Sequence, residues 1–122
     1  MRFTEDAHAA INIIRGYGAG EIRINEQSIR DALIVSASEL LLEPGLNSVA
    51  DLGLAQHARI MSLEPELVLI GTGARQSFPD ASFAALFLRA RVGYEVMDTG
   101  AACRTFNVLV SEGRRVVAAL LV

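Results

Sequence analysis

The second half of the chain alternates strand-like and helix-like stretches, and this alternation constrains the fold more than any other feature. The continuous apolar run over residues 67–70 is typical of a strand buried on both faces. Residues 94–97 and 114–122 predict two further strands. Parallel neighbours need a long crossover between them, usually a helix. The pattern therefore predicts an α/β fold with a central parallel or mixed sheet and packed helices.

Two helices are predicted between these three strands. Pro79-Asp80 opens the first, and Gly93 follows its end. Asp98 or Thr99 caps the second, which runs to about Glu112. Each helix has one apolar stripe at helical spacing, formed by Phe83, Leu86, Phe87 and Ala90 in the first and by Ala102, Phe106, Leu109 and Val110 in the second.

The first half predicts an N-terminal β-hairpin and one more helix. Residues 9–15 and 21–25 are predicted strands, and the glycine-rich stretch 16–20 is the predicted turn. Residues 32–35 form a third apolar run. Ser48 and Asp51 form a capping box before a helix over 49–61, which Gly53 weakens. No repeat or linker interrupts the sequence, so residues 1–122 are predicted to form a single domain.

Composition excludes several classes of chemistry. All 11 residues counted as Lys or Arg are arginines, which excludes a Schiff-base lysine and a Walker loop. Cys103 is the only cysteine, and the two histidines lie far apart, so we expect no metal and no cofactor. The net charge is −3 and the arginines are scattered, so nucleic acid is not an expected partner.

Localisation follows from two further features of the sequence. No apolar run approaches the roughly 18 residues needed to span a membrane. The first residues lack the apolar core of a secretory signal and include Glu5 and Asp6, which are unusual in a mitochondrial transit peptide. We therefore expect a cytoplasmic protein.

Two turns mark the expected site. Ligands of α/β sheets favour the crevice beyond the carboxyl ends of parallel strands, and Gly71-Thr72-Gly73 and Met97-Asp98-Thr99 both leave a strand at such an end. Backbone N–H groups there can hold an anion, with Arg75 and Arg104 as further contacts. The alternatives are a tight turn at the glycines, a helix N-cap at Asp98 and Thr99, and solvated arginines.

Catalytic candidates are few. Asp98 is a possible base or ligand contact, and Cys103 lies one turn into the predicted helix beside Arg104, which would lower the thiol pKa if the thiol were exposed. Free cysteine is usually a buried filler, so we expect Cys103 to be shielded. Ser77 has no visible partners for a triad, and His57 is expected at the surface.

Two segments resemble the motifs of one family. Residues 66–73, with the sequence ELVLIGTG, and residues 94–114, which begin YEVMDTGAACRTFNVL, are similar to the signatures of the Mth-938-like family of unknown-function domains. That family includes the mitochondrial assembly factor 3 of respiratory complex I, NADH:ubiquinone oxidoreductase. The resemblance implies a three-layer α/β fold with a central mixed sheet, no established enzymatic activity and no defined catalytic residues. The one member class with a known role acts as an assembly and interaction partner in mitochondria.

Two functions remain open at this level. The first is a non-catalytic binding or assembly module of the bacterial cytoplasm with an unknown protein partner. The alternative is a small enzyme, or a sensor of an anionic metabolite, that uses Asp98, Cys103 and Arg104 in the crevice. The oligomeric state cannot be read from the residues, although an exposed edge of the hairpin is one route to a dimer.

Overall fold

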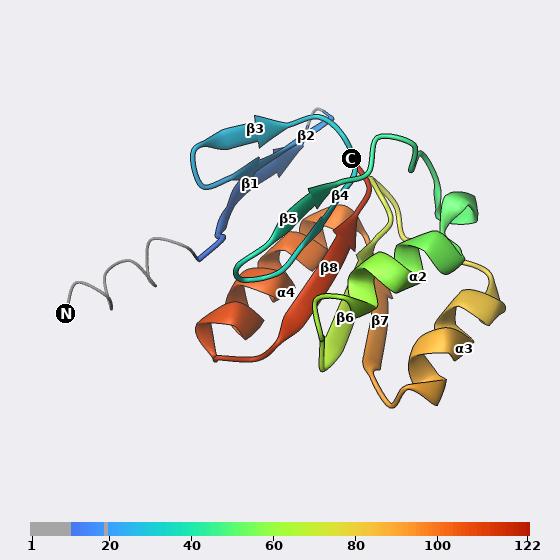
Figure 1. The fold of residues 1–122 in the computed structure, drawn as a ribbon. Helices are drawn as coiled ribbons and strands as arrows, with labels where there is room; N and C mark the ends of the chain where they lie inside the picture. Colours follow the sequence, from blue (N-terminus) through green and yellow to red (C-terminus); the bar gives the residue numbers. More distant parts are fainter. Residues whose placement is uncertain (1–10, 19) are drawn as a thin grey trace.

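A computed structural model describes residues 11–18 and 20–122, which form two sheets and a set of helices (Figure 1). The smaller sheet is antiparallel, in the order β1-β2-β3, with β1 at Ile14–Gly18, β2 at Glu21–Ile24 and β3 at Gln27–Ile29. The larger sheet has the order β5-β4-β8-β6-β7. Its strands are β4 (Leu33–Val35), β5 (Leu40–Leu42), β6 (Leu67–Gly71), β7 (Gly93–Met97) and β8 (Val116–Leu120).

The larger sheet is mixed, as predicted. Strand β6 runs parallel to both β7 and β8, whereas β4 pairs antiparallel with β5 and with β8. The parallel register sets Gly71 opposite Met97 on one side and opposite Leu120 on the other. Three strands of the α/β half therefore end at the same edge of the sheet.

Helices cover both faces of this sheet, which gives three layers (Figure 1). Helices α2 (Leu54–Met61) and α3 (Ala81–Arg89) lie on one face, where Ile60, Phe83 and Phe87 pack on Val68 and Ile70. Helix α4 (Thr99–Ser111) and the smaller sheet lie on the other face. There Phe106 packs with Leu69 and with Ile22 and Ile24 of β2. Alternate side chains of β6 thus serve the two cores.

Most predicted elements of the second half are confirmed. Asp80 caps α3 by accepting a hydrogen bond from the Ser82 N–H, and Asp98 caps α4 by accepting one from the Ala101 N–H. The two predicted strands at 67–70 and 94–97 are β6 and β7, and the last predicted strand is β8. Long, strongly patterned segments are those that sequence predicts best.

The N-terminal half differs from prediction in three places. The predicted turn over 16–20 is wrong, because Gly16 and Tyr17 are paired residues of β1, opposite Arg23 and Ile22. Residues 9 and 10 of the predicted first strand lie outside the described residues, and residues 11–13 are not in a strand. Strands β3 and β5, each of three residues, were not predicted.

The predicted helix over 49–61 is two helices. The Ser48–Asp51 capping box is present, but it caps the short 3-10 helix η1 (Val49–Asp51). Gly53 then adopts an extended conformation and becomes the N-cap of α2. Glycine at this position does not merely weaken the helix; it separates the two segments.

The edge of β1 is covered by a side chain. The Asn107 carboxamide of α4 accepts a hydrogen bond from the Ile14 N–H at 3.0 Å and donates one to the Ile14 carbonyl at 2.8 Å. This pair of hydrogen bonds imitates the contact of a neighbouring strand and ties the smaller sheet to α4.

Candidate functional site

The two predicted turns meet at the edge of the sheet. The Thr72 N–H donates to the Met97 carbonyl, and the Thr99 N–H donates to the Gly73 carbonyl, each at 2.9 Å. The Leu121 N–H donates to the Gly71 carbonyl, also at 2.9 Å. Main-chain bonds therefore join the ends of β6, β7 and β8 around the start of α4.

Thr99 locks this junction with its side chain. Its Oγ1 accepts a hydrogen bond from the Gly73 N–H at 2.8 Å and donates one to the Leu121 carbonyl at 2.6 Å. The residue is buried, and its bond to Leu121 lies out of water, whereas the bond from Gly73 is only partly buried because Gly73 lines the neighbouring cavity. The hydroxyl satisfies two main-chain groups at once and has no free proton to give to a ligand.

The two glycines of the first turn are required for different reasons. Gly73 has a φ of +96°, a conformation that disfavours any residue with a Cβ. Gly71 permits a close approach instead, since an added Cβ would lie 2.8 Å from Leu120 Cδ2 and 3.1 Å from Thr99 Cα. Gly71 thus allows the strand ends to pack closely, and Gly73 allows the chain to turn.

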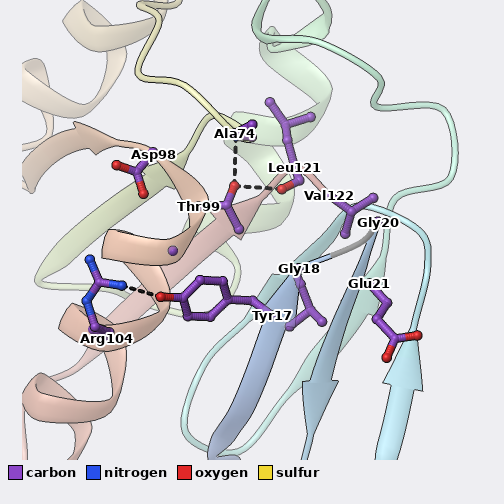
Figure 2. A pocket seen from close by; sticks show the side chains of 13 residues that line it. Tyr17, Gly18, Gly20, Glu21, Ala74, Asp98, Thr99, Arg104, Leu121 and Val122 are labelled. Carbon is purple, nitrogen blue, oxygen red and sulfur yellow. Dashed lines mark hydrogen bonds between the residues drawn. The ribbon is translucent and has the colours of Figure 1, made fainter.

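A cavity of about 320 Å³ opens beside this junction, between the smaller sheet and the first turn of α4 (Figure 2). Four of the predicted site residues line it, namely Gly73, Asp98, Thr99 and Arg104. Gly71, Thr72, Arg75 and Met97 do not line it. The rest of the wall comes from Tyr17, Gly18, Gly20, Glu21, Ile22, Ala74, Gly100, Leu121 and Val122.

Tyr17 is the residue of this site that sequence reasoning missed. Its ring reaches from β1 toward α4, and the Arg104 guanidinium donates a hydrogen bond to its hydroxyl (Figure 2). The guanidinium carbon lies 5.8 Å from the ring centroid, near the outer limit for a cation–π contact, so the hydroxyl is the principal partner. Gly100 makes room for the ring, because a Cβ there would lie 2.6 Å from Tyr17 Cε1.

The remaining polar side chains of the two turns are engaged in local structure. Asp98 Oδ1 accepts the Ala101 N–H at 2.8 Å, as an N-cap does. The Thr72 hydroxyl donates to the Arg75 carbonyl at 2.5 Å and accepts the Ser77 N–H at 3.1 Å. Arg75 itself is exposed. The capping interpretation of Asp98 is therefore the one the geometry supports.

Cys103 is buried, as predicted. Burial raises the pKa of its thiol to about 12, and the nearby Arg104 charge only partly opposes this effect. A thiol with such a pKa is almost entirely protonated at neutral pH and is a poor nucleophile. The structure thus gives no support to a thiol-based reaction.

Three other expectations concern the described residues as a whole. Within residues 11–18 and 20–122, no three potential metal-ligating side chains come together. None of the helices described there is long and apolar enough to cross a membrane. The prediction that His57 lies at the surface is wrong, because its ring is half-buried against Phe87, with centroids 5.0 Å apart, and its Nε2 is buried without a partner.

The fold and the crevice define a class of small α/β domains in which a three-stranded sheet and one helix share a face of a mixed sheet. The chain belongs to the family described as "Protein of unknown function (DUF498/DUF598)", whose model matches residues 14–121. A crystal structure of a Bordetella parapertussis protein superposes with a TM-score of 0.84 at 36% identity, over 92% of this chain and 96% of that one. A solution structure of a Mth938-like domain from Bordetella pertussis superposes with a TM-score of 0.80 at 30% identity, over 92% of this chain and 86% of that one.

Two relatives have names that indicate different roles, one a membrane protein and the other an assembly factor. The "13 kDa major membrane protein" of Francisella tularensis is 27% identical over 95% of both chains. Assembly factor 3 of the NADH dehydrogenase [ubiquinone] 1 alpha subcomplex from Xenopus tropicalis is 37% identical over 67% of this chain and 45% of its own length. The predicted family resemblance and three-layer fold are confirmed.

Proposed function

We propose that this protein is a non-catalytic binding or assembly module that recognises a protein partner through the crevice between β1 and the start of α4. One observation carries the proposal: two exposed side chains, Tyr17 and Arg104, line the cavity, while the groups that could do chemistry are buried or hydrogen-bonded. Tyr17 and Arg104 are the residue types enriched among interface hot spots. Thr99, Asp98 and Cys103 are used by the fold itself.

The comparisons support a protein partner over a substrate. The family description records no activity, and two relatives are named as assembly factors.

The proposal includes the bacterial cytoplasm as the location. Because a relative is named a membrane protein, fractionation of the native cell with and without a salt wash tests this part separately.

Quantitative affinity capture tests the proposal. Tagged wild type and Arg104→Ala are each used to capture partners from the native cell, with Arg23→Ala as the matched control. Arg23 is an exposed arginine of β2 that does not line the cavity. We expect Arg104→Ala to reduce recovery of a specific partner at least about fivefold, as loss of a hot-spot contact does, and Arg23→Ala to leave it unchanged.

The outcomes against the proposal are equally specific. If Arg104→Ala and Arg23→Ala both recovered as much of the partner as wild type does, the crevice would not be the binding surface. A small anion that co-purifies in stoichiometric amount with wild type, and is lost from Arg104→Ala, would favour the metabolite-sensor alternative. Mass spectrometry of the same captured samples distinguishes these results.

A further inference from the structure

Helix α3 carries apolar residues on its outer side as well as on its core side. Phe83 and Phe87 point into the core, and at about 100° per residue the opposite side carries Ala81, Ala85 and Leu88, flanked by Ser82 and Arg89. Leu88 is 66% exposed, and Phe78, just before the helix, is 70% exposed. A surface helix normally presents charged and polar residues to water. We call the three apolar residues Ala81, Ala85 and Leu88 the outer face of α3.

The two ends of this face carry opposite charges. Asp80 is exposed at the start of α3, and hydrogen bonds from Ser82 hold the pKa of its carboxyl below the usual range, so it is ionised at neutral pH. Arg89 and Arg91 are exposed at the other end. The face is therefore complementary to a copy of itself that runs in the opposite direction.

We propose that α3 pairs antiparallel with α3 of a second copy of this chain, with the two-fold axis beside Ala85. Each Asp80 then lies near the Arg89 end of the partner helix, so the symmetric contact makes the same charge pairing twice. The helix dipoles oppose one another favourably, and alanine at the centre lets the two backbones approach closely. In a parallel pair the like-charged ends would meet.

The interface is small. Nine helical residues span about 13 Å, so the contact is below the size of stable complexes and the dimer forms only at high protein concentration. Figure 1 shows α3 at the periphery of the molecule, on the face of the larger sheet opposite α4. The pairing thus leaves the crevice open and does not depend on the function proposed for it.

Sedimentation equilibrium tests the pairing. The wild-type chain is expected to shift from monomer toward dimer as its concentration rises into the millimolar range. Leu88→Glu should weaken this association at least about tenfold. Val108→Glu is the matched control, because Val108 is a 54% exposed apolar residue of α4 on the opposite side of the sheet. It should leave the association unchanged.

Cross-linking tests the direction and register of the pair. Ala85→Cys lies beside the axis and should form a disulfide-linked dimer under mild oxidation, whereas Val108→Cys should not. A wild-type chain that stays monomeric throughout would overturn the proposal. So would a dimer that resists Leu88→Glu, or one in which Ala85→Cys fails to cross-link. If the wild-type chain stays monomeric and Leu88→Glu no longer binds another protein that wild type binds, the outer face is the binding surface for that protein instead.

Discussion

Replacing Thr99 by valine removes the hydroxyl that joins three strand ends while keeping nearly the same side-chain shape. Two main-chain groups lose their partner: the Gly73 N–H and the Leu121 carbonyl. The Leu121 carbonyl is buried, so we assign it an unsatisfied-group cost of about 1–3 kcal/mol. The Gly73 N–H borders the cavity, where water can reach it, and we assign it about 1 kcal/mol. The expected loss of unfolding free energy is therefore about 2–4 kcal/mol.

Urea unfolding measures this loss directly, with the requirement that the slope m stays unchanged. Thr105→Val is the matched control on the same helix, because the Thr105 hydroxyl donates a hydrogen bond to the Met97 sulfur, at 3.6 Å. Sulfur is a weak acceptor, so this variant should lie within about 0.5 kcal/mol of wild type. A Thr99→Val loss no larger than that of Thr105→Val would refute the assignment of Thr99 as the lock of the junction.

Three further predictions concern the core and the turns. Gly71→Ala should destabilise by about 1–3 kcal/mol because its Cβ meets Leu120, and Gly73→Ala by about 1 kcal/mol or more because its φ is positive; both are read from urea unfolding. Cys103 should resist a thiol reagent in the native protein and react fully when unfolded. Because burial raises its pKa from 9.0 to about 12, its contribution to stability is complete below pH 9 and is lost as pH rises toward 12, which thermal unfolding across that range detects. Rapid labelling of Cys103 in the native protein would contradict both its burial and its raised pKa. His57→Phe should stabilise by about 1 kcal/mol in thermal unfolding, since it removes a buried nitrogen without a partner, and any loss of stability would count against that reading.

The sequence predicted the half of the fold whose signals are local. The buried run 67–70, the Asp80 and Asp98 caps and the helix stripes each depend on residues within a few positions of one another. The meeting of the two turns was also predictable, because parallel strands end at one edge of a sheet. Both expectations rest on periodicity and chain direction alone.

The N-terminal sheet was harder to predict because long-range pairing decides it. Gly16 and Tyr17 have turn-like neighbours, yet pairing with β2 makes them strand residues. Strands β3 and β5 are too short to show a period. Tyr17 and Asn107 act through partners about 90 residues away, in contacts that no local pattern reveals.

The central claim is that the crevice with Tyr17 at its mouth binds a protein partner, and Gly100→Ala tests it most directly. The added Cβ would lie 2.6 Å from Tyr17 Cε1, so the ring must move away from its present place beside Arg104, whose guanidinium bonds its hydroxyl. Gly45→Ala is the control, because a Cβ there meets nothing within 4 Å. In quantitative capture of the partner, we predict a several-fold loss for Gly100→Ala and none for Gly45→Ala. Unchanged binding by Gly100→Ala, with the Tyr17 ring shown by NMR to have moved, would contradict the claim.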